Sequence, residues 1–266
     1  MPIKTLDLKV ADYMSPKPLV VRDDSSFLDA VQIMADKEIG NLVVEKHHKP
    51  IGILTERQIL EHLSIHKNIS DSKLSDINLN KFDTVTPTMR LIDAANLMIK
   101  KKTRLLVFDT KRLVGIITAT DMVRAFRRTR ANPDLSKVQS TSLHTIDYDD
   151  TIHAASKMMY KKRIGSLIVL KKKKPYGIFT ERDLLVNVIA NDVDTQNPVG
   201  GYCTTPFVKS AVGIKGGDAS KIMSKNKIKR LVLTKAGKFY AIVTARDIVE
   251  SFSNSFSDED YIEFHC

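Results

Sequence analysis

One short phrase occurs four times along the chain, each time as an apolar segment that runs into a threonine and a polar helix start. The copies read GILTERQIL from residue 52, GIITATDMV from 115, GIFTERDLL from 177 and AIVTARDIV from 241. Their threonines differ in residue number by 63, 62 and 64, at Thr55, Thr118, Thr180 and Thr244. A regular period of this length predicts four copies of one supersecondary unit.

A second shared segment precedes each phrase. It reads GNLVV from residue 40, TRLLV from 103, GSLIV from 165 and KRLVL from 229. The step to the threonine is 14 residues in every copy, counted from Asn41, Arg104, Ser166 and Arg230. Between the two apolar segments lie polar turns, KHHKP, DTKR, KKKKP and KAGK, which predict a β-hairpin in each copy.

A strand and a helix are expected before each hairpin. The short β-rich pieces are LVV from 19, TVT from 84, HTI from 144 and FV from 207. In the first copy Leu28, Val31, Met34 and Ala35 recur at helical steps and share one face. The phrase then starts a second helix, for example RDLLVNVI from 182. The predicted fold class is α/β (α+β), with the order β-α-β-β-α in each repeat.

The repeats are expected at 8–66, 74–128, 136–192 and 199–253, followed by an acidic tail at 254–266. A unit of about 60 residues is marginal for folding alone, so the copies should pair. The longest polar link, RRTRANPDL at 127–135, lies near the midpoint and suggests two modules of two repeats each. The tail either is disordered or docks on a partner, and its residues do not separate these alternatives.

Composition excludes several classes of protein. The 266 residues are 42% hydrophobic, which argues against wholesale disorder. No apolar run approaches the roughly 20 residues of a membrane span, and the segment MPIKTLDLKV lacks a secretory apolar region. Cys203 and Cys266 form neither a disulfide framework nor a zinc pattern, so a cytoplasmic, reducing location is expected.

The formal net charge of +11 favours anionic partners, whether nucleotides, nucleic acid, acidic proteins or an anionic membrane surface. Basic clusters lie at 100–102, 161–163, 171–174 and around Arg124 to Arg130. Such runs are usually solvated faces. The chain lacks tryptophan and any helix-turn-helix, zinc-finger or RNA-motif signature, so nucleic acid is expected only as a non-specific contact.

Catalytic and metal patterns are missing from the sequence. His62 and His66 are four residues apart, but no third ligand completes a metal site. No Ser-His-Asp or Cys-His arrangement has supporting context. Because the repeats take up nearly the whole chain, no separate catalytic domain has room, and we predict a protein that is not an enzyme.

The Thr-x-x-Asp pattern of the phrase has two interpretations. Threonine caps helices and an acidic residue suits the first turn, and Gln58 completes such a capping box with Thr55. Alternatively, the carboxylates of the other three copies accept hydrogen bonds from the hydroxyls of a ribose, while threonine and free N–H groups meet a phosphate. The residues alone leave both interpretations open.

Together, the β-α-β-β-α repeat, GIFTERDLL and IGSLIV resemble the CBS domain, named after cystathionine β-synthase. Four copies as two tandem pairs, or Bateman modules, resemble stand-alone archaeal and bacterial CBS proteins and, in layout, the gamma subunit of AMP-activated protein kinase. The resemblance covers residues 8–253. It specifies the fold more closely than the ligand, because many CBS modules bind nothing known.

The resemblance implies that adenosine derivatives bind in clefts between paired repeats. It assigns ribose binding to Asp121, Asp183 and Asp247, and the base pocket to Ile116, Ile178 and Ile242. It assigns phosphate binding to Thr118, Thr120, Thr180, Thr244, Arg104 and Arg230, and Lys229 adds charge there. Asn41 and Ser166 depart from the basic position, and Gln58 departs from the acidic one. The first site should therefore be weak or empty, which leaves up to three competent sites.

The expected function is that of a regulatory, non-catalytic protein that senses ATP, ADP, AMP, S-adenosylmethionine or a dinucleotide. Ligand binding would shift the population of repeat arrangements. No other cofactor, no metal and no membrane is expected, and the expected partners are a second copy of the chain or an unidentified regulated protein. The alternative is a structural or nucleic-acid-binding protein that has the fold but does not sense nucleotides.

Overall fold

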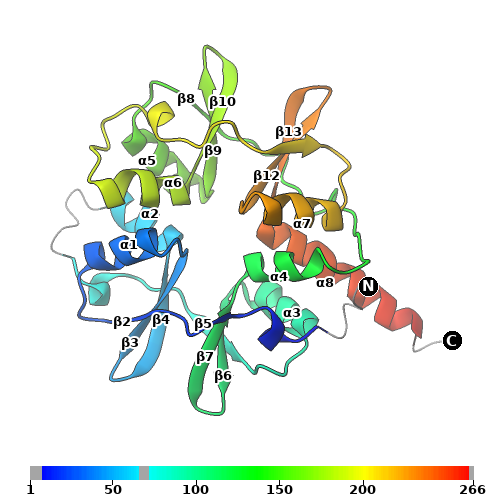
Figure 1. Cartoon of the computed structure of the whole chain (residues 1–266). Helices are drawn as coiled ribbons and strands as arrows, with labels where there is room; N and C mark the ends of the chain where they lie inside the picture. The colour runs from blue at the N-terminus through cyan, green and yellow to red at the C-terminus, as the bar shows by residue number, and fades with distance from the viewer. Residues whose placement is uncertain (1–7, 66–71, 264–266) are drawn as a thin grey trace. The chain divides into compact units, whose positions relative to one another are not determined.

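Each repeat builds a small sheet in the computed structural model, which describes residues 8–65 and 72–263 (Figure 1). The first strand is parallel to the second, and the second forms an antiparallel hairpin with the third. The strands of repeats 1 and 2 are β2 (Val20–Arg22), β3 (Asn41–Lys46), β4 (Lys49–Thr55), β5 (Phe82–Val85), β6 (Arg104–Asp109) and β7 (Arg112–Ile117). Those of repeats 3 and 4 are β8 (Thr145–Asp147), β9 (Ser166–Lys171), β10 (Lys174–Thr180), β11 (Lys209–Ala211), β12 (Arg230–Lys235) and β13 (Lys238–Thr244).

Two helical segments accompany each sheet, one before the hairpin and one after it. They are α1 (Phe27–Asp36) and α2 (Glu56–Ile65), α3 (Leu91–Lys101) and α4 (Ala119–Phe126), α5 (Ile152–Lys162) and α6 (Glu181–Asp183), and α7 (Gly216–Lys225) and α8 (Ala245–Glu263). After α6 the helix continues as the π-helical η4 (Leu184–Val188) and the 3-10 turn η5 (Ile189–Asn191). The predicted order β-α-β-β-α is confirmed.

The apolar face expected in the first helix is present but rotated slightly. Phe27, Ala30, Val31 and Met34 are the buried residues of α1, while Leu28 and Ala35 at the margins of that face are half-buried. The hairpin that follows explains the 14-residue step, because Asn41 faces Thr55 across β3 and β4. Each hairpin contains one register shift near its tip, which leaves a two-residue turn.

Four short segments leave their own repeat and pair with another one. We call residues 8–18, 72–81, 133–142 and 197–207 the bridging segments; they include η2 (Val10–Asp12), β1 (Ser15–Pro16), η3 (Leu74–Asp76) and η6 (Val199–Gly201). Each pairs with the last of the three strands of a repeat. The paired residues are Ser15 and Ile116, Asn80 and Ile53, Thr204 and Ile178, and Ser140 and Ile242. Each also accepts the first N–H of a helix, as Leu8 O does from Leu91 and Ser72 O does from Phe27.

The bridging segments follow a simple rule. The segment that leads into repeat 1 pairs with repeat 2, and the segment that leads into repeat 2 pairs with repeat 1. Repeats 3 and 4 exchange their segments in the same way. Consecutive repeats therefore exchange the segments that lead into them, one of which pairs as the short strand β1 and three through isolated bridges.

The compact units do not follow the order suggested by the polar link at the midpoint. One unit contains repeats 1 and 3 (Leu19–Lys81 and Leu143–Phe207), and the other contains repeats 2 and 4 (Met1–Pro18, Phe82–Ser142 and Val208–Cys266). We call them the 1/3 unit and the 2/4 unit. The link at 127–135 lies wholly within the 2/4 unit, where Asn132 Oδ1 accepts a 2.8 Å hydrogen bond from the N–H of Gly217 in α7.

Helices of the two repeats pack together within each unit. In the 2/4 unit α3 and α4 contact α7 and α8, and the fully buried rings of Phe126 and Phe252 stack at 4.2 Å. In the 1/3 unit α2 contacts α5 and α6, and Leu60 of repeat 1 joins the core of repeat 3. Among the described helices, none has the length and apolar composition needed to cross a bilayer.

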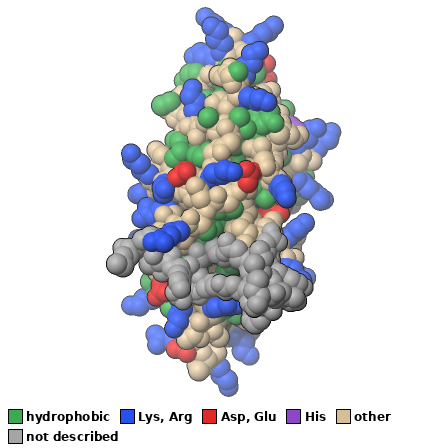
Figure 2. Space-filling view, turned by 90° about the vertical axis from the view of Figure 1, so that its right-hand side faces the viewer, with side chains coloured by type: hydrophobic (Ala, Val, Ile, Leu, Met, Phe, Trp, Pro, Cys, Tyr) green, Lys and Arg blue, Asp and Glu red, His purple; other side chains and the backbone are tan. Residues whose placement is uncertain are grey.

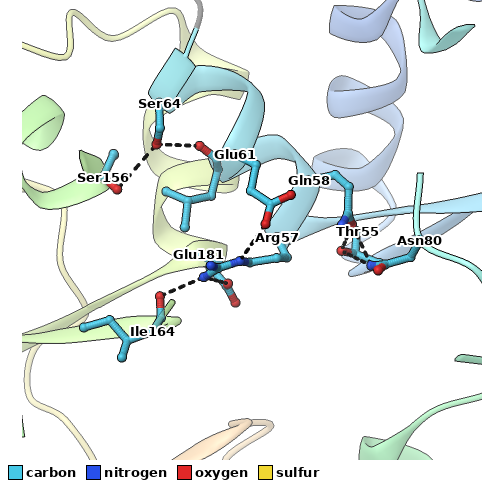
Figure 3. A network of polar contacts seen from close by, with 10 residues as sticks. Thr55, Arg57, Gln58, Glu61, Ser64, Asn80, Ser156, Ile164 and Glu181 are labelled. Carbon is cyan, nitrogen blue, oxygen red and sulfur yellow. Dashed lines mark hydrogen bonds and ion pairs between the residues drawn. The ribbon is translucent and has the colours of Figure 1, made fainter. Parts of the chain in front are cut away.

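Polar side chains also connect the two repeats of the 1/3 unit. Arg57 donates to Ile164 O at 3.1 Å and lies 3.6 Å from the carboxylate of Glu181 (Figure 3). Arg182, at the matching position of repeat 3, donates to Glu38 O at 3.3 Å and lies 3.8 Å from buried Glu56. The arginines of the two Thr-Glu-Arg sequences thus tie repeats 1 and 3 to each other reciprocally. In the 2/4 unit Arg246 makes the equivalent bond to Met98 O at 2.9 Å, while Thr120 stands at the matching position of repeat 2.

Candidate functional site

The turn from the third strand to the following helix has the same geometry in repeats 2, 3 and 4. In repeat 2 the N–H and hydroxyl of Thr118 donate to Asp121 Oδ2 at 2.9 and 2.7 Å. The N–H of Asp121 in turn donates to the Thr118 hydroxyl at 3.4 Å. The same bonds join Thr180 to Asp183 and Thr244 to Asp247. The capping interpretation therefore describes the turn, but it uses only Oδ2 of each carboxylate.

The second carboxylate oxygen distinguishes the three copies. Asp121 Oδ1 accepts a 3.1 Å bond from Arg124 and a 3.5 Å contact from the Ser15 hydroxyl. Asp183 Oδ1 accepts bonds from Thr204 at 2.7 Å and from Asn187 at 3.3 Å. No hydrogen bond from a described residue reaches Asp247 Oδ1, and Asp247 is half-buried where the other two carboxylates are buried. Repeat 4 thus presents the most accessible acceptor.

Repeat 1 fills the equivalent place with amides (Figure 3). The Asn80 amide donates to Gln58 Oε1 at 2.7 Å and to Thr55 Oγ1 at 3.1 Å, and the Thr55 hydroxyl also donates to Gln58. Thr55 and Gln58 are buried, with 2% and 7% of their surface exposed. Gln58, which replaces the aspartate of the other copies, therefore belongs to a buried cluster whose polar groups bond to one another.

The bridging segments supply residues that were not predicted. Ser15, Asn80, Ser140 and Thr204 occupy one equivalent position, each opposite an isoleucine two residues before the threonine of the phrase. Three of the four reach the acidic or amide side chain of the turn. Ser15 is 106 residues from Asp121. The segments share a small polar residue and a buried apolar residue five or six positions before it, which are Val10, Leu74, Leu135 and Val199. This signal is too weak to identify them.

The remaining predicted residues lie at the same end of each hairpin. Arg230 faces Thr244 directly across β12 and β13, so their side chains share one face. Arg104 begins β6, next to the facing pair Leu105 and Ile117. Lys229 precedes Arg230, and Thr120 is exposed in the first turn of α4. Of the base-pocket residues, Ile116 and Ile178 are each 7% exposed, and Ile242 is half-buried.

Burial governs the electrostatics of two carboxylates. Desolvation raises the pKa of Asp121 above its ordinary value, although bonds from Thr118 and the charge of Arg124 act in the opposite direction. Desolvation likewise raises the pKa of Asp247 against the bonds from Thr244. The ionised carboxylates are therefore less stable than in water, and a ligand that donates hydrogen bonds to them would relieve part of that cost.

No group of three or more His, Cys, Asp and Glu side chains placed to hold a metal ion occurs among residues 8–65 and 72–263. His62 donates to or accepts from the Ser72 hydroxyl at 2.9 Å and packs against Phe27. His66 lies outside the described residues.

Comparison with known families and proteins agrees with this architecture. The CBS domain model matches residues 10–65, 74–128, 135–189 and 199–254. An uncharacterized protein of Methanocaldococcus jannaschii is 30% identical over 113 residues, 41% of this chain and 61% of that protein. An uncharacterized 33.4 kDa protein of Thermofilum pendens is 24% identical over 201 residues, 70% of this chain and 66% of that protein. The chain thus spans just under two thirds of the length of these two relatives.

A solved structure from M. jannaschii shares the fold over nearly the whole chain. It is described as a candidate archaeal homolog of g-AMPK, and it superposes with a TM-score of 0.76 at 16% identity. The match covers 92% of this chain and all of that one.

Proposed function

Since this chain belongs to the CBS domain family, we propose that it is a regulatory protein that binds adenosine-containing ligands at the strand-to-helix turns of repeats 2, 3 and 4. The observation that carries the proposal is the carboxylate that each of these turns presents. Oδ2 is held by the helix cap, and Oδ1 points to the bridging segment or, in repeat 4, has no described donor. AMP, ADP, ATP and S-adenosylmethionine all carry the ribose diol that such an oxygen would accept.

The surroundings of the turn suit the rest of such a ligand. The isoleucine two residues before the threonine offers an apolar wall for a base. Arg104 and Arg230 lie at the same end of their hairpins, and a guanidinium suits bidentate contact with phosphate. Because two of the carboxylates are desolvated, hydrogen bonds from the ribose hydroxyls would stabilise their charged form.

The sites are expected to be unequal. A ligand at repeat 4 meets an available Oδ1, whereas at repeat 2 it must displace Arg124 and at repeat 3 it must displace Thr204 or Asn187. Repeat 1 has no carboxylate and its amide cluster is closed. We therefore expect repeat 4 to be occupied first.

The bridging segments suggest how binding is transmitted. Ser140 pairs with the third strand of repeat 4, and the same segment leads within a few residues into β8 of repeat 3. A ligand that contacts the segment would favour one arrangement of linked repeats over another, which is a population shift. The regulated target would be another protein or a second copy of this chain, and the low cysteine content favours a cytoplasmic setting.

The test is a calorimetric and thermal-shift screen of the whole chain against AMP, ADP, ATP, S-adenosylmethionine, NAD and a dinucleotide. A ligand at 100 times its Kd adds about 2.7 kcal/mol to the stability. Asp247→Asn keeps the cap acceptor but removes the charge, and it should eliminate the tightest binding event. Asp121→Asn, Asp183→Asn and Asp247→Asn combined should eliminate all binding.

The matched control is Asp109→Asn, which removes an exposed carboxylate from the tip of the β6–β7 hairpin in the same unit as Asp247. It should leave affinity and stoichiometry unchanged. Absence of binding by every adenosine compound, or full binding by the folded triple variant, would refute the proposal.

A further inference from the structure

The tips of the hairpins carry an unfavourable arrangement of charge. In three hairpins the residues flanking the two-residue turn are lysines that face each other directly: Lys46 and Lys49, Lys171 and Lys174, and Lys235 and Lys238. Like charges directly opposite in an antiparallel pair are destabilising. The β6–β7 hairpin has the attractive pair Asp109 and Arg112 at the same place, so the fold itself does not require the repulsive pair.

The β9–β10 hairpin adds a second unfavourable feature. Its turn consists of Lys172 and Lys173, with φ of 50° and 61°, where such turns favour Asn-Gly. Lysine in this left-handed region is disfavoured because its Cβ crowds the backbone. All four lysines from 171 to 174 are exposed, so burial does not compensate for the strain. The corresponding turn of repeat 4 uses Ala236 and Gly237.

The base of this tip is held by aromatic rings. Lys171 Nζ lies 4.1 Å from the ring centroid of Tyr148 and 5.1 Å from that of Tyr176. The two rings meet edge to face at 5.1 Å. Lys172, Lys173 and Lys174 make no ion pair with any described residue. One ammonium group is thus positioned by the protein, and three remain available to a partner.

Three carboxylates lie near the hairpin. Asp147 faces Leu170, and Asp149 and Asp150 follow Tyr148, whose ring lies beneath Lys171. Within the described part of the chain none of the three forms an ion pair with a lysine of the tip, so they leave its positive charge unpaired. Figure 2 shows Lys and Arg side chains projecting from the surface at the upper end of the view.

We propose that this tip, Lys171–Lys174, binds the phosphate backbone of nucleic acid. A partner with several closely spaced anionic groups offsets the repulsion between the lysines. None of the four residues is apolar, so the tip lacks the anchor that a protein hot spot or insertion into a membrane interface requires. Lysine contacts phosphate as a point charge, without reading bases, so this contact needs only the exposed tip.

The test measures binding of the full chain to a labelled mixed-sequence duplex of roughly 24 base pairs by fluorescence anisotropy, across a salt series. The informative variant is Lys172→Asn with Lys173→Gly, which removes two charges and gives the turn its preferred residues. Affinity should fall, and the slope of log Kobs against log salt should become shallower by about 1.8, 0.9 for each lost phosphate contact. The melting temperature should rise, because repulsion and backbone strain are both relieved.

The matched control is Lys161→Gln with Lys162→Gln, which removes the same charge from exposed positions of α5 in the same repeat. Its salt slope should equal that of the unmodified chain. Equal losses in both variants, unchanged affinity in the tip variant, or no duplex binding at low salt would each overturn the proposal. Tip-dependent binding to phosphatidylserine vesicles that is tighter than binding to the duplex would overturn it in favour of a membrane.

Discussion

At the residue scale, four nearly identical phrases give four different environments. Asp121, Asp183 and Asp247 share one cap geometry, yet their second oxygens meet an arginine, a threonine with an asparagine, and no described donor. The loss of the carboxylate at Gln58 could be read from the sequence. That Asn80 closes this position could not, because Asn80 lies on a bridging segment 22 residues away.

Asn80 should contribute to stability through its two hydrogen bonds. Asn80→Ala leaves the buried oxygens of Thr55 and Gln58 without these donors, and the free energy of unfolding should fall by about 1–3 kcal/mol. Urea denaturation measures the change. Ser140→Ala alters the equivalent position of repeat 4, where no described residue bonds to the hydroxyl, and it should stay within about 0.5 kcal/mol. Similar losses in the two variants would contradict the assigned role of Asn80.

Asp247 should make stability depend on pH in a predictable direction. Burial raises its pKa in the folded chain, so its contribution to stability is fully present below the unfolded pKa and is lost as pH rises through the folded pKa. The unmodified chain should therefore gain stability relative to Asp247→Asn as pH falls through the raised pKa towards the unfolded value. Denaturation of both proteins across this pH range provides the comparison.

Asp134 supplies a control of opposite sign. Lys215 and Ser136 lower the pKa of Asp134, so its contribution is present above the unfolded pKa and is lost as pH falls through the lowered folded value. Relative to Asp134→Asn, the unmodified chain should lose stability on acidification, with a small amplitude because the group is exposed. If acidification changed the stability difference in the same direction for Asp247→Asn and Asp134→Asn, the assigned pKa shifts would be wrong.

At the element scale, the bridging segments decide how the strands and helices of different repeats are joined. They pair with the last strand of each hairpin, and a backbone carbonyl of each segment accepts the first N–H of the helix that precedes a hairpin. The one that contains η6 packs closely on repeat 3, where Gly200 N donates to Tyr148 O at 3.0 Å and its Cα lies against the Tyr148 ring. The periodicity of the sequence showed the helices and hairpins but gave no sign of these contacts.

Gly200→Ala should disrupt this packing. The added Cβ would overlap the Tyr148 ring, which cannot move away without disturbing Tyr176 and Lys171, so we expect a loss of about 1–3 kcal/mol. Gly201→Ala is the matched control, because nothing lies within 4 Å of its added Cβ. It should change stability by no more than about 0.5 kcal/mol. Thermal and urea unfolding measure the stability of both variants. Unchanged stability in both would contradict the predicted overlap with Tyr148.

At the scale of the whole molecule, the two compact units are interleaved in the sequence. The 2/4 unit takes three separate stretches of chain and the 1/3 unit takes two. Phe126 packs on Phe252, and Leu60 lies in the core of repeat 3, so each core depends on both halves of the chain. A cut near the midpoint would therefore divide both units instead of separating them.

Fragments 1–130 and 131–266 test this interleaving. Each fragment alone should expose the apolar helix faces that its absent repeats cover, and it should self-associate or melt at a lower temperature than the whole chain. Mixing the fragments should restore a 1:1 complex, which light scattering after size-exclusion chromatography would detect. Two monomeric fragments that both keep the melting temperature of the whole chain would rule out the interleaved units.

The sequence by itself determined the four-fold repeat, the order β-α-β-β-α and the position of each hairpin. These features depend on local periodicity and on residues at most a few positions apart, so they are legible within one copy and reinforced by the other three. Only the tertiary structure decided which repeats share a core and which side chain faces each motif carboxylate. Those contacts join segments such as Ser15 and Asp121, 106 residues apart, and no local pattern specifies which distant segments meet.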